Sequence, residues 1–274
     1  MWEKMCVDKK INIKSFITCF EKHIFRDEDF YFDGESHNFW EMVYITEGEW
    51  GISADDRVYN LTEGQVIFHK PMEFHKHWKN SKIKSGCLVC SFELEGDCSF
   101  LEGNVFKLSH NQRGLVENIL FAIRKFSRDE LYKLLDQGSS VGHYVANTLE
   151  NLFILLSEDS KKVSTVADSA DALLFNKSVN ILKQHISSHI TTENVASICN
   201  VSVSKINKLF ASYAGCGVHS YLIKLKINEA ILLLRDGHSS KEISNKLGFN
   251  NQNYFSITFK RETGLSPMNY KKKM

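Results

Sequence analysis

The sequence predicts an α+β protein of two domains, with an N-terminal β-barrel or sandwich and a C-terminal all-α region. Short alternating apolar runs, separated by turns, extend from about residue 30 to residue 94. After residue 109 the apolar residues recur every three or four positions, as in amphipathic helices. The last hundred residues contain an internal repeat. The length of 274 residues fits about two domains.

Composition excludes several classes of protein. Hydrophobic residues make up 43% of the chain and charged residues 24%, which is typical of globular proteins. The seven cysteines are scattered, and the single CxxC of Cys87 and Cys90 has no second pair to complete a zinc site. Lys9, Lys10 and Lys14 interrupt the apolar residues near the N-terminus, so we expect no signal peptide and no membrane segment. We expect a reduced, cytoplasmic protein.

Charge is divided unevenly along the chain. Residues 176–274 carry 14 basic and 5 acidic side chains, a net charge of +9, whereas residues 1–175 carry 20 basic and 28 acidic ones, a net charge of −8. The two values sum to the overall charge of +1. A basic C-terminal region beside an acidic N-terminal one suggests a polyanion as partner of the basic part.

The β-rich region is defined by its alternation. Leu88, Cys90 and Phe92 alternate along the third of three predicted strands, and turns with glycine or aspartate separate the runs. Strands at this spacing predict a small barrel or sandwich. The predicted strands are residues 41–46, 64–69 and 84–94, and the turns are residues 47–48, 54–56 and 63–64.

Two amphipathic helices are predicted next, at Arg113–Phe126 and Val141–Ser157. Their apolar stripes exceed what covering one barrel face needs, so we expect a homodimer through these helices, with Leu149 and Leu152 at the interface. Packing of the helices against the barrel is the alternative. The polar residues that follow suggest a linker. The predicted domains are residues 1–157 and 176–274, joined by a linker at 158–175.

The C-terminal repeat has a period of 49 residues. Upstream the shift is 48 residues, so one extra residue lies in the turn of the second copy. Each copy predicts a helix, a short turn and a second helix, and the apolar run Val218–Arg235 predicts one long helix between the copies. Two helix-turn-helix units on a connecting helix follow from this pattern. The shift aligns Ile206 with Phe255, Phe210 with Phe259, Gly215 with Gly264 and Tyr221 with Tyr270.

About 95 C-terminal residues resemble the AraC family of bacterial transcription regulators. The resemblance rests on Gly248, Phe249, Tyr254, Phe255, Phe259, Lys260, Gly264, Ser266, Pro267 and Tyr270, and on the first copy and the linker helix Leu225–Leu234. The first 110 residues are similar to the cupin-like sensor barrel common in that family. The resemblance implies a cytoplasmic homodimer that binds double-stranded DNA, contacts RNA polymerase as an activator, and responds to a small-molecule effector such as a sugar or a related metabolite.

The second helix of each unit is the expected DNA reader. Asn and Gln can bond adenine edges in the major groove, about 12 Å wide, and Lys can bond guanine. Two positions depart from the family pattern, because Ile257 stands where a polar residue is common and Thr258 replaces an aliphatic one. The expected DNA-binding residues are Val203, Ser204, Lys205, Asn207, Lys208, Asn251, Gln252, Asn253, Ser256, Ile257 and Lys260.

The N-terminal histidines predict a ligand site. His37, Glu41 and His75 resemble three of the four cupin metal ligands, but Glu35 stands where the first histidine belongs. Three ligands would still allow a metal with an open position, yet regulator cupins commonly lack metal, so we expect none, and no other cofactor. We expect His37, Glu41 and His75 to contact an effector, with Trp40 and Trp78 as stacking platforms.

We expect no catalytic residues, since no Ser-His-Asp, P-loop or GxGxxG arrangement is present. Two alternatives stay open. One is an effector-independent regulator with an inert barrel, and the other is a metal-dependent cupin enzyme fused to a helical domain.

Overall fold

The structure is a computed structural model that describes residues 11–25, 29–55, 57–79, 82–126, 130–131, 139–158, 161–163 and 169–273. It divides the chain into two compact units, Met1–Val166 and Ala167–Met274. Within the described ranges, no helix is both long enough and apolar enough to cross a lipid bilayer.

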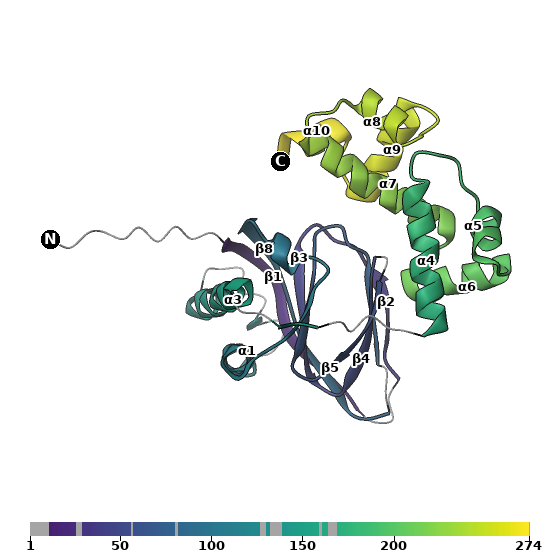
Figure 1. Ribbon diagram of the computed structural model, residues 1–274. Helices are drawn as coiled ribbons and strands as arrows, with labels where there is room; N and C mark the ends of the chain where they lie inside the picture. The colour runs from purple at the N-terminus through teal and green to yellow at the C-terminus, as the bar shows by residue number, and fades with distance from the viewer. Residues whose placement is uncertain are drawn as a thin grey trace. The chain divides into compact units, whose positions relative to one another are not determined.

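The first unit contains two antiparallel sheets that face each other (Figure 1). The six-stranded sheet has the order β1-β8-β3-β6-β9-β10, and the four-stranded sheet has the order β2-β7-β4-β5. The described strands form a sandwich and do not close into a continuous barrel. The strands are β1 (Ile11–Ile24), β2 (Tyr31–Glu35), β3 (Trp40–Glu47), β4 (Glu49–Ala54), β5 (Arg57–Thr62), β6 (Gln65–His69), β7 (His75–Lys79), β8 (Ser85–Gly96), β9 (Val105–Lys107) and β10 (Lys161–Lys162), with a short 3-10 helix at Ser99–Leu101.

The three predicted strands are present as β3, β6 and β8. The turns between them depend on left-handed backbone, with φ of 76° at Gly48 and 78° at Gly64, where a side chain would be strained. The sequence did not reveal β1, a strand of 14 residues that pairs with β8 from Ile11 to Ile24. Two register shifts interrupt the pairing of β1, so its apolar side chains do not alternate regularly.

Two helices pack on the outer face of the six-stranded sheet (Figure 1). Helix α1 (His110–Ile123) begins at a capping box in which the Ser109 and Gln112 side chains bond each other's backbone amides, and α3 (Ser140–Glu158) lies beside it. The predicted role of Leu149 and Leu152 was wrong, because both side chains are fully buried in the core between these helices and the sheet. The apolar stripes of α1 and α3 therefore pack against the six-stranded sheet.

The second unit is all-helical, and its two copies match closely. Helices α6 and α9 each have 12 residues, start 49 positions apart, and end at a left-handed glycine, Gly215 or Gly264. Equivalent aromatic pairs pack edge to face in each copy, with ring centroids 5.3 Å apart for Phe210 and Tyr221 and 5.4 Å for Phe259 and Tyr270. The helices are α4 (Ala170–Gln184), α5 (Thr192–Cys199), α6 (Val203–Ala214), α7 (Val218–Arg235), α8 (Ser240–Lys246), α9 (Gln252–Thr263) and α10 (Pro267–Lys273).

Helix α4 begins inside the segment expected to be a linker. Its N-cap is Ser169, whose hydroxyl accepts a hydrogen bond from the Ala172 amide. The Phe175 ring is fully buried, with centroids 5.2 Å from Phe210 and 5.3 Å from Tyr213. Residues 170–175 therefore belong to the helical unit, which starts before the predicted residue 176.

This packing predicts where an independent DNA-binding fragment must begin. A fragment of residues 167–274 keeps the cap and Phe175, whereas a fragment that starts at Asn176 loses both. Since deleting a buried phenyl ring costs about 3–5 kcal/mol, we expect the longer fragment to unfold cooperatively in urea at a clearly higher midpoint. Equal midpoints for the two fragments would contradict the assignment of Phe175 to this core.

Candidate effector cavity and nucleic-acid interface

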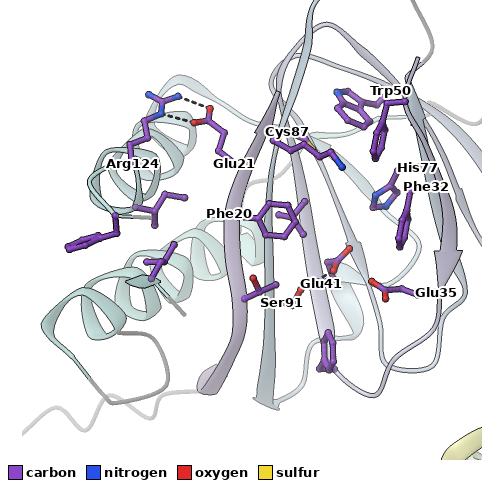
Figure 2. Close-up of a pocket in the computed structure, with 18 residues that line it drawn as sticks. Phe20, Glu21, Phe32, Glu35, Glu41, Trp50, His77, Cys87, Ser91 and Arg124 are labelled. Carbon is purple, nitrogen blue, oxygen red and sulfur yellow. Dashed lines mark hydrogen bonds and ion pairs between the residues drawn. The ribbon is translucent and has the colours of Figure 1, made fainter. Parts of the chain in front are cut away.

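A cavity of about 720 Å³ lies in the first unit, and its wall is formed by residues of both sheets and by residues at the C-terminal end of α1 (Figure 2). Aromatic side chains form much of its wall, and the Phe30 and Trp50 rings meet edge to face at 5.5 Å. A mostly apolar cavity with a few directed polar groups is the usual form of a small-molecule site. The aromatic residues of the wall are Phe20, Phe30, Phe32, Phe39, Trp50 and Phe126.

The charged residues of this wall include the Arg124–Glu21 pair, the Glu35 and Glu41 carboxylates, and Lys22, whose ammonium lies 3.7 Å from the centroid of the Phe30 ring (Figure 2). Arg124 binds Glu21 through two hydrogen bonds of 2.7 Å each, and these bonds hold the pKa of Glu21 below its usual value. Away from this pair, Glu35 and Glu41 approach each other from β2 and β3. Arg124 and Glu21 neutralise each other's charge. The Glu35 and Glu41 carboxylates therefore form the polar end of the cavity that can recognise a ligand.

Glu41 is the centre of this polar end. Its side chain is only 7% exposed and accepts a hydrogen bond of 2.9 Å from the Ser91 hydroxyl, while Nε2 of His75 lies 3.3 Å and Nε2 of His37 lies 3.6 Å from its oxygens. Burial alone would raise the pKa of Glu41, but the His37 and His75 rings lower it well below the usual value. Burial lowers the pKa of His75, but the Glu41 carboxylate raises it by more. The net result is a pKa above the usual value.

A second layer of polar side chains supports these histidines. The His69 ring stacks on His75 at 4.2 Å, its Nδ1 lies 2.8 Å from Glu73, and its Nε2 lies 3.2 Å from Nε2 of His77. Burial lowers the pKa of both His69 and His77 well below the usual value, with the nearby histidines adding to the effect. Sequence reasoning missed these residues, although the alternation of His75 and His77 along β7 places both rings on one face.

The structure brings together three of the five predicted ligand-binding residues, His37, Glu41 and His75. The two tryptophans lie elsewhere. Trp40 precedes Glu41 on β3 and therefore faces the opposite way, into the core beneath α1 and α3. Trp78 covers Gly51 on the outer face of the four-stranded sheet, where a Cβ atom would lie 2.1 Å from the ring. Neither ring is among the residues that line this cavity, so the cavity does not support their predicted role as stacking platforms.

Glu35 joins the three clustered residues. One donor atom from each of Glu35, His37, Glu41 and His75 can be chosen so that all four lie within 4.8 Å of one another. Such a set of two imidazoles and two carboxylates could hold a metal ion. Glu35 stands where the cupin pattern has its first histidine. Its carboxylate can itself be a metal ligand.

The expected DNA readers of α6 differ in their surroundings. Ser204, Asn207 and Lys208 are exposed, whereas Val203 and Lys205 are half-buried. The Lys205 ammonium forms an ion pair of 2.6 Å with Asp171 of α4. Helix α6 therefore leaves three of its five expected readers exposed.

The expected readers of α9 also divide into two groups. Gln252, Asn253, Ile257 and Lys260 are exposed, and Ile257 is 68% exposed although it is apolar. Ser256 is half-buried. The Asn251 side chain accepts a hydrogen bond from the Tyr254 amide at 2.8 Å, so it caps the helix.

The apolar pattern of α9 predicts that Tyr254 and Thr258 face inward, and Tyr254 departs from this expectation. Tyr254 is 40% exposed, which the sequence did not predict. Thr258 is buried as expected, and its hydroxyl oxygen has no hydrogen-bond partner. Burying an unpaired hydroxyl lowers stability, which is the physical consequence of placing threonine at an aliphatic position.

Comparison with known proteins agrees with both parts of this description. Residues 195–273 match the helix-turn-helix domain family, and residues 20–93 match the AraC-like ligand binding domain family. The uncharacterised regulator YfiF of Bacillus subtilis is 26% identical over 243 residues, which are 84% of this chain and 76% of that protein. The transcriptional activator RhaR of Cronobacter sakazakii is 24% identical over 248 residues, 86% of this chain and 85% of its own length.

Among solved structures, fatty-acid-bound ToxT of Vibrio cholerae aligns over 95% of this chain and 96% of its own, with 16% identity and a TM-score of 0.38. The two family matches and the regulators that align along most of the chain agree on one assignment. The chain belongs to the AraC family of transcription regulators, with an N-terminal ligand-binding domain and a C-terminal helix-turn-helix region that binds DNA.

Proposed function

We propose that this regulator binds a small-molecule effector in the cavity of its first unit and reads its operator through α6 and α9. The observation that carries the proposal is the repeated helix-turn-helix unit, in which each of two matching helices exposes several of the expected reader side chains. Regulation rather than catalysis is the proposed role, which the regulator relatives support. We place the protein in the cytoplasm, where an activator of this family would contact RNA polymerase.

The cavity favours an effector with hydroxyl groups and an apolar face. Carboxylates accept hydrogen bonds from hydroxyls, and aromatic rings pack against C–H surfaces. Glu35, Glu41 and Ser91 supply the polar end, while Phe20 and Phe32 belong to the aromatic wall. A sugar or a related polyol satisfies both requirements.

We also propose a homodimer, formed through apolar side chains that α1 and α3 leave exposed. These are Phe121, Tyr144, Ile154 and Leu155, with exposed fractions of 67%, 46%, 49% and 38%. They replace Leu149 and Leu152 as the proposed contacts. A second copy of the same helices presents a self-complementary apolar surface, as a two-fold interface requires.

The base-reading role of α6 is tested by site selection with variants of the full chain. We expect Lys208→Ala to flatten the preference at one operator position, because losing a bidentate base contact costs about 1–3 kcal/mol. Ile257→Ala should have a smaller effect at a single A·T pair, where the side chain can only touch a thymine methyl, and Gln252→Ala should lie between them.

Lys177→Ala, an exposed lysine on α4, is the matched control for Lys208. It should leave every base preference unchanged. A uniform loss of affinity for Lys208→Ala, with all base preferences intact, would make Lys208 a phosphate contact instead of a reader.

Affinity for duplex DNA should also fall steeply with salt. The helical region carries a net charge of +9, and each phosphate that it neutralises releases counterions. We expect the logarithm of the binding constant to decrease linearly with the logarithm of salt concentration, and an exposed phosphate-contacting lysine changed to alanine should reduce the slope by about 1. Titration by fluorescence anisotropy at several salt concentrations measures this slope, and a flat response would contradict electrostatic binding.

The proposed dimer predicts that Phe121→Glu combined with Ile154→Glu gives a folded monomer in analytical ultracentrifugation. Both side chains are exposed in one copy, so a charge there costs little folding energy and disrupts only the interface. Leu173→Glu, at a 52% exposed position on α4, should leave the dimer intact. A dimer that survives the double change would place the interface elsewhere.

A further inference from the structure

We propose that the sensor domain binds a divalent first-row transition-metal ion through Glu35, His37, Glu41 and His75. The four donor groups come from both sheets and the segment that joins them. Glu35 ends β2, Glu41 is the second residue of β3, His75 starts β7, and His37 lies between β2 and β3. Their donor atoms lie within 4.8 Å of one another, so a single ion can reach all four after small side-chain adjustments.

The imidazole tautomers suit a metal. Nδ1 of His37 lies 3.1 Å from the Phe39 carbonyl oxygen, and Nδ1 of His75 lies 3.1 Å from the Glu73 carbonyl oxygen. Since a carbonyl oxygen can only accept, each Nδ1 carries the hydrogen and donates it. The other nitrogen of each ring, Nε2, is left to bind the ion, and this backbone contact is the usual outer-shell support of a metal-bound histidine.

Both Nε2 atoms are buried and make no hydrogen bond. Nε2 of His75 lies 3.3 Å and Nε2 of His37 lies 3.6 Å from the Glu41 oxygens. A buried polar atom without a partner costs free energy, and here two such atoms point at the same carboxylate. An ion placed among them would satisfy both atoms at once.

The chemistry of the donors selects the class of ion. Two imidazoles with carboxylates suit zinc, iron, cobalt or nickel, whereas magnesium and calcium prefer oxygen ligands alone. Glu35 and Glu41 also line the cavity, so a coordination position left open by the protein faces that space. A hydroxyl or carboxylate oxygen of a small molecule could occupy that position.

Contacts that neighbouring side chains make with the four donors support the same assignment. Ser91 donates a hydrogen bond to the Glu41 carboxylate, and His69 stacks on the His75 ring. These contacts hold two of the four donors in place before any ion arrives. Pre-positioned ligands of this kind are typical of metal centres.

The test uses the full chain, stripped of metal by a chelator, kept reduced, and titrated with Co²⁺ alone while the visible absorption is recorded. We expect one ion per chain and a spectrum of nitrogen and oxygen ligands, and no binding of Mg²⁺ at the same concentration. Glu41→Gln and His37→Gln should each weaken Co²⁺ binding by at least about 10–100-fold, the loss typical of disturbing even outer-shell partners. Glu35→Gln should weaken it as well.

His110→Gln is the matched control, because this histidine is exposed on α1, outside the donor set. It should bind Co²⁺ like the unaltered chain, and circular dichroism should show that every variant is folded. Unchanged Co²⁺ affinity in Glu41→Gln overturns the proposal, and so does a thiolate-to-cobalt charge-transfer band, which would assign the ion to cysteines. Unchanged affinity in Glu35→Gln alone overturns the assignment of Glu35. Selection of DNA-binding sites with the metal-free protein tests DNA reading independently of metal binding.

Discussion

The two faces of β3 carry side chains of different chemistry, and the organisation of the first unit depends on this division. Trp40, Met42 and Tyr44 point outward and belong to the core beneath α1 and α3, whereas Val43 and Ile45 point between the sheets. Side chains alternate strictly along a strand. The alternation therefore turns Glu41 inward and places a carboxylate between the two sheets.

A buried carboxylate needs partners, and these partners build the site. An isolated charge at this depth would cost several kcal/mol, and the Ser91 hydroxyl and the nearby histidine rings favour the ionised form of Glu41 against this cost. Each of these residues comes from a different part of the unit. The requirement of one side chain thus ties β3, β7 and β8 together at the polar end of the cavity and leaves the aromatic residues to form the remaining wall.

How much the sequence reveals differs between the two units. The helical unit was largely predictable, because the repeat, the capping residues and the glycine ends are local signals that agree with each other. The start of this unit was not predictable, because the residues before Leu173 are mostly polar or small and do not distinguish the N-cap at Ser169 from a linker. Phe175 shows its importance only through contacts with residues 35 and more positions away.

The β-rich unit was less predictable for physical reasons. Periodicity identifies the apolar face of α3, but it does not say whether a sheet or a second chain covers that face, and Leu149 and Leu152 were misplaced for this reason. The bulges of β1 remove its alternation. For Glu35, spacing along the chain counted against a metal site, whereas spatial proximity favours one. A donor set is defined by distance, which a motif only approximates.

The division of charge also has a consequence for how such a regulator finds DNA. Long-range attraction to phosphates raises the rate of encounter but is the same for every sequence. An acidic region of −8 joined to a basic region of +9 keeps the whole chain close to neutral, so non-specific attraction is weaker than the basic region alone would give. Discrimination then depends more on short-range contacts, and the exposed Asn207, Lys208 and Gln252 side chains are suited to provide them.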